Sequence, residues 1–562
     1  MHDRVMSTSC RFAASILAMA LIGVACLPSA QPPDTTEAPR GGTLVVAWWN
    51  EPADLLPYVV SQLPARILSH FAVEGLIGVA PDGEYQPWLA REVPTTANGG
   101  VRVLANGRMD VTYKLLSGVV WSDGQPFTSD DVKYTWQFVM KEPTVFSREG
   151  FDRIESIETP DALTAIVHFS EIYAPYLILF EHVLPRHLLG SVEEVSKTDY
   201  GRRLLGTGPF RVTEFVAGDH LTVERNTAYR IKNRPILDRI IFRFIPSRDT
   251  AFLQLKVGEV DAMWSLLESQ GAELEKSGEA KLLVGPSSQV WRLEFNLAKP
   301  GDPADPSIPH PVLGDLAVRR ALTLATPKRQ IIDSLLFGKG DVANSLLSIG
   351  WAAPTDLVQD GYDPAKAKQI LDQAGWLPGP SGVRAKRETR ATLTISSLST
   401  DPVRVKIEQV LVDEWKNIGI ELKIRNFPVS QLFAVGGPVR QGDFDIDMYA
   451  EALRVDPHVR LSERYHSKSI PRRENRLVGL NWNRFGTPEM DSLLERAAVI
   501  VDRGERVKIY RQLLQIVNDQ YLNVWLYAQN NIDAFRANVG GYGRSNPWMT
   551  FGWDAENWSV RR

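Results

Sequence analysis

The stretch from residue 392 to residue 424 constrains the fold of this chain most. It carries a strand pattern at residues 392–396, a helical pattern at 403–418 and a second strand pattern at 420–424. A strand, a helix and a strand in direct succession form a crossover, and such a crossover joins parallel strands. The stretch therefore favours an α/β fold, in which a helix packs on a parallel pair.

Local signals elsewhere predict further strands and helices. The continuous apolar run at residues 41–49 predicts a buried strand. Asn106-Gly107 lies between alternating segments and predicts a hairpin. Thr128 and Asp131 have the spacing of a capping box, so we expect a helix to begin there. Other predicted elements are a strand at 442–447 and helices at 249–257, from 363, at 490–501 and at 507–517.

The size, charge and motif content of the chain limit its function. Its 562 residues exceed what one hydrophobic core usually holds, so we expect two or more. The 63 basic and 67 acidic residues nearly balance, which removes the bulk electrostatic case for nucleic-acid binding. The sequence has no HExxH, GxSxG or Walker A pattern. His458 and His466 flank Glu463, but we interpret them as solvated loop residues, and we expect neither catalysis nor a metal or other cofactor.

The N-terminal residues have the pattern of an export signal. Arg4 and Arg11 precede an apolar run at residues 12–25, which is shorter than the roughly 20 residues that span a bilayer. We predict a signal peptide at residues 1–25, with a buried core helix as the alternative. Cys26 would be the first mature residue, and the segment LIGVAC resembles a bacterial lipobox. We therefore expect lipidation of Cys26 and a flexible, lipid-anchored tether at residues 26–42.

Tryptophans beside the predicted strands are candidates for ligand contact. The chain has 15 tryptophans, and five of them lie in or next to strand patterns: Trp48, Trp49, Trp264, Trp291 and Trp482. A flat apolar ring with one polar edge suits a cleft that accepts varied ligands at a low cost in entropy. Packing in a hydrophobic core is the alternative for each of them.

Eight segments resemble, in order, those of one protein family. The most characteristic is SGVVWSDGQPFTSDDVKYTW at residues 117–136; the others lie at 84–92, 206–212, 223–229, 258–262, 316–332, 362–376 and 481–497. Together they resemble the bacterial extracellular solute-binding proteins of family 5. Members of that family include the dipeptide-, oligopeptide- and nickel-binding proteins of ABC importers.

The resemblance implies an α/β fold of two lobes, the type II periplasmic-binding-protein fold of cluster C, with an extra insert domain in the first lobe. It assigns residues 43–84, 205–286 and 524–562 to lobe I, residues 85–204 to the insert domain and residues 287–523 to lobe II. Two strand crossings would join the lobes, which would close around a ligand by a hinge motion.

The resemblance also implies where a ligand is held. In peptide-binding relatives an acid in a tryptophan-containing segment of the second lobe pairs with the peptide amine. The corresponding residues here, 448–461, lack the tryptophan and offer Glu451 and Asp456 as acids. Glu294 matches an acid that faces the cleft in oligopeptide binders, and Arg454 could pair with a ligand carboxylate. A role as ordinary surface charges is the alternative for Arg454 and Asp456.

These features together predict a substrate-binding lipoprotein of an ABC importer, which is not an enzyme. It would capture a solute, which we predict to be an oligopeptide, and deliver it to a membrane permease that works with ATPase subunits. The alternatives are a binding protein for oligosaccharide or another small solute, and a ligand-sensing receptor without transport. We expect a monomer that is exported to the periplasm or the outer face of the cell membrane and does not bind nucleic acid.

Overall fold

A mixed sheet of eleven strands runs through the computed structural model, which describes residues 40–301, 306–399, 401–434 and 436–561. The predictions for residues 1–25 and for Cys26 lie outside the described residues. Along the sheet, neighbouring strands are β18 (Glu421–Ile424), β17 (Thr392–Ser396), β19 (Ile446–Ala452), β12 (Ala280–Phe295), β20 (Asn523–Arg536), β11 (Ala262–Met263), β1 (Thr43–Trp48), β10 (Arg239–Phe244), β9 (His220–Arg225) and β8 (Phe210–Val216), and β13 (Gly340–Val342) pairs with β20.

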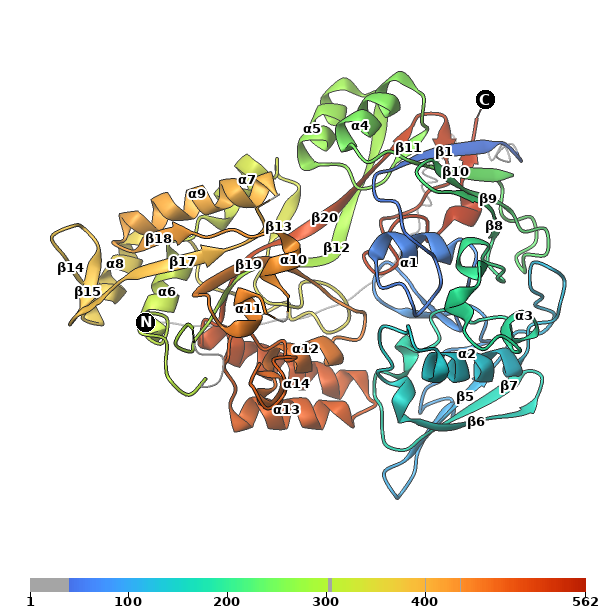
Figure 1. Cartoon of the computed structure of the whole chain (residues 1–562), viewed down its shortest axis with the longest axis horizontal. Coiled ribbons are helices and arrows are strands. Elements are labelled where there is room, and N and C mark those ends of the chain that lie inside the picture. The colour runs from blue at the N-terminus through green and yellow to red at the C-terminus, as the bar shows by residue number, and fades with distance from the viewer. Residues whose placement is uncertain (1–39, 302–305, 400, 435, 562) are drawn as a thin grey trace, which may run out of the picture. The chain divides into compact units, whose positions relative to one another are not determined.

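Two long antiparallel strands, β12 and β20, connect two groups of elements. They have 16 and 14 residues, and their pairing register shifts between Pro286 and Val290 and again between Trp291 and Arg292. Such shifts are bulges or irregularities, which bend a strand and re-aim its side chains. Figure 1 shows β12 and β20 side by side, with different helices near their two ends. We call the group with β1 and β8–β11 the first lobe, and the group with β17–β19 the second lobe.

The first lobe also contains a four-stranded sheet in the order β4 (Val101–Val103), β5 (Met109–Lys114), β7 (Thr164–Phe169) and β6 (Ile154–Asp161). β4 and β5 pair antiparallel, which confirms the predicted hairpin. The helix predicted to begin near Thr128 is α2 (Ser129–Lys141), and the Thr128 backbone N–H donates to Asp131 Oδ2 at 2.9 Å. Further elements are α1 (Leu63–His70), β2 (Ile77–Val79), β3 (Tyr85–Pro87), α3 (Arg186–Leu189), α4 (Arg248–Val257), α5 (Glu268–Ser277), β21 (Val539–Gly540) and β22 (Ser559–Val560).

The second lobe contains the predicted crossover. β17 and β18 pair in parallel and α9 (Pro402–Asn417) joins them, so this prediction is confirmed. A separate hydrophobic cluster forms under α12 (His458–Tyr465), α13 (Pro488–Ala498) and α14 (Arg503–Asp519). The other helices and small strands are α6 (Leu316–Leu324), α7 (Lys328–Leu335), α8 (Pro364–Gln373), α10 (Val429–Leu432), α11 (Pro438–Gln441), β14 (Leu377–Pro378), β15 (Arg384–Lys386) and β16 (Thr389–Arg390).

The strand predicted at residues 442–447 is wrong over most of its length. Gly442 has a positive φ of 71° and ends α11, and β19 begins only at Ile446. Between them, Asp445 accepts hydrogen bonds from the Thr394 backbone N–H at 2.7 Å and contacts His310 Nε2 at 2.9 Å. The alternating acids at residues 443–447 therefore belong largely to a turn that connects α11 to β19, and the Asp445 carboxylate in this turn binds neighbouring segments.

In the described ranges, no helix combines the length and apolar character needed to cross a bilayer.

Candidate functional site

A cavity of about 390 Å³ has walls from both lobes. Its volume lies within the ~300–1,000 Å³ range of small-molecule sites. The first lobe contributes residues from α1, β2 and β3 and from residues 146, 177, 178 and 181. The second lobe contributes residues 452–455 and 460, and β12 and β20 contribute Ser287, Ser288, Gln289 and Asn531. The cavity therefore lies where the two lobes meet, beside the irregular part of β12.

Aromatic side chains form much of the first-lobe wall. Tyr85, Trp88 and Phe146 line the cavity, together with Trp548 from the segment that follows β20. Trp88 stands edge-on to His70, with ring centroids 6.4 Å apart. Such a wall gives a solute a large apolar contact area, and its ring faces can stack on flat groups. The hydroxyl of Tyr85 is buried and has no hydrogen-bond partner among the described residues.

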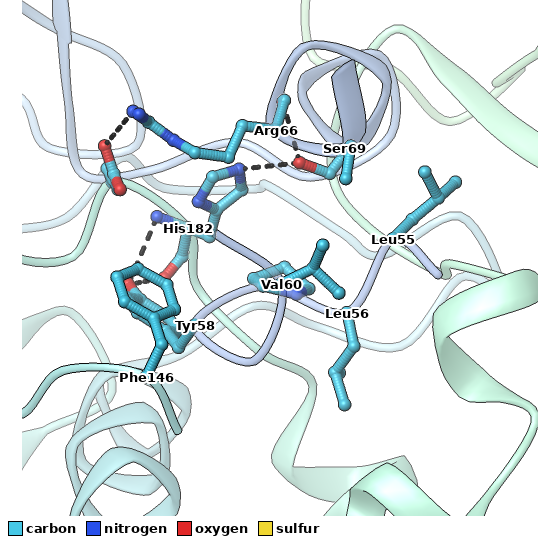
Figure 2. Close-up of a pocket in the computed structure, with 11 residues that line it drawn as sticks. Leu55, Leu56, Tyr58, Val60, Arg66, Ser69, Phe146 and His182 are labelled. Carbon is cyan, nitrogen blue, oxygen red and sulfur yellow. Dashed lines mark hydrogen bonds and ion pairs between the residues drawn. The ribbon is translucent and has the colours of Figure 1, made fainter. Parts of the chain in front are cut away.

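A polar network beside α1 borders a second, smaller pocket, which Figure 2 shows and which shares Arg66, Phe146 and Glu181 with the cavity wall. Arg66 pairs with Glu181 at 3.2 Å, and Ser69 Oγ lies 3.1 Å from His182 Nε2. The Tyr58 hydroxyl donates to the His182 carbonyl at 2.7 Å. Burial lowers the pKa of His182 to about 4. The ring is therefore neutral at pH 7, and Arg66 and Glu181 are the charged residues that this network shares with the cavity wall.

Three arginines line the cavity, and their surroundings differ. Arg66 has Glu181 as its partner, and Arg460 pairs with Glu451 at 3.1 Å and Glu463 at 2.8 Å. Arg454, in the loop between β19 and α12, is exposed. Among the residues that the structure describes, no carboxylate lies within 4.0 Å of the Arg454 guanidinium in an ion pair. Arg454 is thus the cavity cation without a direct counter-charge in the described part of the chain.

Glu451 lies behind the second-lobe wall and contacts three arginines. It pairs with Arg464 at 2.6 Å, with Arg292 at 3.1 Å and with Arg460 at 3.1 Å. Burial acts to raise the pKa of Glu451, but the three guanidinium groups prevail and lower it to about 2. The carboxylate is therefore charged at neutral pH and holds Arg460 in the wall. Glu451 would therefore act on a ligand indirectly, through Arg460, and not by direct contact.

The structure brings three predicted tryptophans together, in the core of the first lobe. Trp48 and Trp264 stack with ring centroids 4.2 Å apart, and Trp49 stacks on Trp264 at 5.5 Å. Trp48 is fully buried. The described residues that line the cavity do not include these three. The arrangement fits the alternative of packing in a hydrophobic core.

Trp291 and Glu294 lie on β12 but face different surroundings. Trp291 stacks on Tyr527 at 5.7 Å and carries the Arg404 guanidinium 4.4 Å from its ring centroid. Glu294 is buried, accepts a hydrogen bond from the Tyr449 hydroxyl and lies 3.5 Å from Arg292. Neither is among the described residues of the cavity wall.

Asp456 is a buried partner of α14. Its carboxylate receives two hydrogen bonds from Arg506, at 2.5 Å and 2.7 Å, and one from the His458 backbone N–H at 3.0 Å. Only 4% of its side chain is exposed. This carboxylate is fully engaged within the second lobe, so pairing with a ligand amine would require breaking a buried ion pair.

Sequence reasoning missed most of the cavity wall. Arg66, Glu181, Arg460 and Trp548 come from four separate segments, and nothing local distinguishes them from surface charges or a core aromatic ring. A signal did exist for Tyr85 and Trp88, because both fall in residues 84–92, one of the segments that carried the family resemblance. Arg454 is the predicted contact that lies in the wall.

Comparisons with known proteins agree with the fold. The family described as "Bacterial extracellular solute-binding proteins, family 5 Middle" matches residues 84–469. The oligopeptide-binding protein AppA of Bacillus subtilis is 26% identical over 448 residues, 78% of each chain. The nickel-binding periplasmic protein of Escherichia coli is 24% identical over 492 residues, 85% of this chain and 87% of that one.

The fold itself is that of a solved relative. The structure of B. subtilis AppA in complex with a nonapeptide superposes with a TM-score of 0.70 at 24% identity, and covers 94% of this chain and 100% of AppA. The predicted two-lobe α/β fold of the periplasmic binding proteins is therefore confirmed. The relatives are periplasmic or extracellular binding proteins, and they differ in what they bind.

Proposed function

Because the chain belongs to the bacterial extracellular solute-binding proteins of family 5, we propose that it captures a short oligopeptide in the cavity between its lobes. The lobes would close on the peptide by a hinge motion at β12 and β20, and the closed form would present it to an ABC permease and its ATPase. The observation that carries this proposal is a cavity with walls from both lobes, since only such a site couples ligand binding to closure.

The cavity wall supports a peptide in several ways. The aromatic side chains Tyr85, Trp88 and Trp548 offer contact area for apolar side chains. Arg66, Glu181 and Arg454 offer both signs of charge. Ser287, Ser288 and Gln289 line the cavity where the register of β12 shifts, so they add small and polar side chains to the wall. The AppA relative binds oligopeptides by its name.

A small saccharide is the second candidate ligand. Trp88 and Trp548 both line the cavity, and the flat face of an indole ring can stack on a sugar ring. The nickel-binding relative shows that the family also has members with other ligands. A ligand-sensing receptor without transport would use the same cavity. Binding of the protein to a permease would distinguish an importer from such a receptor.

We assign residue roles as follows. Arg454 contacts the ligand directly, and Glu451 acts through Arg460. The other sequence-based candidates stay predictions, and they lie outside the described cavity wall: Trp48, Trp49, Trp264, Trp291, Glu294 and Asp456. The division into lobe I (43–84, 205–286 and 524–562), the insert domain (85–204) and lobe II (287–523) is likewise part of the proposal.

We propose export through the signal peptide and anchoring by a lipid on Cys26. The test compares the chain with its Cys26→Ser variant, expressed in bacteria supplied with labelled palmitate. Label and protein should be in the membrane fraction for the parent chain, and both should leave that fraction for the variant. Equal membrane association of the two would contradict the anchor.

The ligand is tested by purifying the mature chain under native conditions and identifying the bound solute by mass spectrometry. We expect peptides in one-to-one complex with the protein. A bound glycan would overturn the peptide class and favour the second candidate. Conversion of the released solute by the purified protein would contradict a binding function altogether.

A further inference from the structure

The segment that carries Trp548 is fixed on the first lobe. Asn546 is fully buried, and its side-chain amide donates a hydrogen bond to the Val79 carbonyl of β2 at 2.9 Å. Its Oδ1 atom accepts from the backbone N–H groups of Trp548 and Met549, at 2.9 Å and 3.1 Å, and its carbonyl accepts from the Thr550 N–H at 2.8 Å. One buried side chain therefore holds both the turn and its position on β2.

The Trp548 indole lies against two glycines, one from each lobe. Gly83 is in the turn between β2 and β3 of the first lobe, and Gly350 directly precedes Trp351 in the second lobe. A Cβ atom placed on Gly83 would lie 3.4 Å from the indole Nε1 atom, and one placed on Gly350 would lie 2.8 Å from its Cζ2 atom. Gly350 therefore accommodates the ring only because it has no side chain. The Cβ on Gly83 would also lie 3.3 Å from Gly350 Cα, so the lobes touch at this point.

The same indole forms part of the cavity wall. It lines the cavity, and it packs against the hydrophobic cluster under α12, α13 and α14. Its N–H is buried and has no hydrogen-bond partner among the described residues, so the ring contributes bulk to the wall. Because the ring fills the space between the lobes at one border of the cavity, its size limits how far a bound solute extends in that direction.

The volume of the cavity corresponds to a short solute. A residue of an extended chain occupies about 160 Å³, the product of a rise of ~3.3 Å, a strand spacing of ~4.8 Å and a sheet spacing of ~10 Å. The cavity of about 390 Å³ thus has room for about two or three residues of an extended peptide. A longer peptide needs additional space, and the Trp548 ring, which is about as large as one peptide residue, occupies the space that borders the cavity.

We propose that Trp548 determines the length of the solute on which the lobes close. This inference rests on the proposed peptide-binding function and adds to it a limit of about three residues. A longer peptide has to displace the indole from between Gly83 and Gly350, and this displacement separates the lobes and removes the contacts that closure forms. Trp548 thereby couples the size of the solute to closure.

The test uses an equimolar ladder of synthetic peptides, with degenerate sequences and with lengths from two to nine residues. The ladder is incubated with the solute-free mature chain, and the retained peptides are quantified by mass spectrometry for each length. We expect the parent chain to retain the shortest peptides. Retention should fall by about tenfold or more between peptides of three and of five residues.

Variants connect the length limit to the ring. Trp548→Ala should move the limit to longer peptides and raise the retention of five-residue peptides by about tenfold, and Trp548→Phe, with a smaller ring, should have an intermediate effect. Trp553→Ala is the matched control. Trp553 is half-buried in the same C-terminal segment, its indole N–H donates to the Arg544 carbonyl at 2.8 Å, and it is not among the described residues of the cavity wall. Circular dichroism shows whether each variant is folded, and Trp548→Phe carries the comparison if Trp548→Ala does not fold.

The outcomes separate this inference from the proposed function. Three results overturn the role of Trp548 and leave peptide binding standing: retention of all lengths by the parent chain, the same length limit in the folded Trp548 variants, or loss of all retention in them. If the parent chain retains no peptide, peptide binding itself fails, and the solutes that co-purify with the parent chain and with Trp548→Ala decide the inference. Heavier solutes in the variant support a size limit at Trp548, and equal masses overturn it.

Discussion

At the scale of single residues, two buried aspartates of the second lobe have opposite surroundings. Asp456 is engaged by Arg506 through two hydrogen bonds, whereas both carboxylate oxygens of Asp447 are buried without a hydrogen-bond partner among the described residues. Burial raises the pKa of Asp447 well above its usual range, and the charge of Glu294 adds to that rise. An aspartate side chain therefore stabilises the fold at position 456 and destabilises it at position 447.

We expect Asp447→Asn and Asp456→Asn to change stability in opposite directions. Asp447→Asn removes a buried ionisable group without a partner and should raise the free energy of unfolding by on the order of 1 kcal/mol at neutral pH. Asp456→Asn leaves the Arg506 charge uncompensated and should lower it by about 3–5 kcal/mol. Urea unfolding of both variants measures the difference. Equal effects of the two would contradict this reading of their surroundings.

The Glu451 network gives stability an acid-sensitive component. The pKa of Glu451 is about 2 in the folded chain, against an ordinary value of 4.5, so the unfolded chain binds the proton first as the pH falls. The stabilisation is complete above the ordinary pKa and is lost as the pH falls through the folded-state pKa. It is on the order of 3 kcal/mol. Urea unfolding of the parent chain should show that the free energy of unfolding falls steeply as the pH decreases from the ordinary pKa of 4.5 towards about 2.

A variant assigns that profile to Glu451. Glu451→Gln should flatten it, because the amide does not titrate. Glu463→Gln is the control, since Glu463 contacts Arg460 from a more exposed position, with 37% of its side chain accessible. A profile in Glu451→Gln as steep as that of the parent chain would show that other carboxylates cause the acid sensitivity.

The sequence predicts structure well where a residue acts on its neighbours in the chain. It predicts little where the fold brings together residues that are distant in the sequence. Asn106-Gly107 and Thr128 act on their own neighbours, so their patterns were sufficient. A tryptophan on a strand has the same pattern whether it faces a core or a cleft, as Trp48 illustrates. Arg66 and Trp548 lie far apart in the sequence, and only the folded chain places both in one wall.

At the scale of elements, the N-terminus of α2 shows how a local pattern is reinforced by tertiary contact. Asp131 accepts from the Thr128 backbone N–H and from the Arg186 backbone N–H, both at 2.9 Å, so it caps α2 and binds the start of α3. The sequence indicated the first bond and could not indicate the second. Similarly, the crossover at 392–424 was predictable, whereas the 16-residue length of β12 depends on its pairing with β20.

We expect Asp131→Ala to destabilise the first lobe more than a simple helix cap would. Removing the carboxylate leaves two backbone donors without their partner in a buried place, which should cost about 2–4 kcal/mol in the free energy of unfolding. Asp130→Ala is the matched control and should cost less than half as much, because Asp130 is only half-buried and its carboxylate accepts one hydrogen bond, from the Thr159 hydroxyl at 3.0 Å. Thermal unfolding monitored by circular dichroism compares them, and equal losses would show that the bond to Arg186 contributes little.

At the scale of the whole molecule, one arginine connects the lobes beside the cavity. Arg503, at the start of α14, donates to Glu84 Oε2 at 3.0 Å. Its guanidinium lies 5.2 Å from the ring centroid of Tyr85 and 4.7 Å from that of Trp351. Glu84 and Tyr85 belong to the first lobe and Arg503 and Trp351 to the second, and Tyr85 also lines the cavity. The contact therefore stabilises the arrangement in which the lobes are together.

We expect Arg503→Ala to weaken solute binding without changing which solute is bound. Loss of the contact favours the arrangement with the lobes apart, so the apparent affinity should fall by about threefold to tenfold. Lys508→Ala on the same helix is the control, because Lys508 pairs only with Glu505 in the described structure. Calorimetric titration with the co-purified solute measures both variants. Unchanged affinity in Arg503→Ala would mean that the contact does not contribute to closure.

Small-angle X-ray scattering of the mature chain, recorded without solute and then at saturation with its co-purified solute, tests the central claim most directly. Since the cavity takes its walls from both lobes, binding should bring the lobes together, and the radius of gyration should decrease. An identical scattering curve in the two states, at a solute concentration that calorimetry shows to be saturating, would contradict closure around a bound solute.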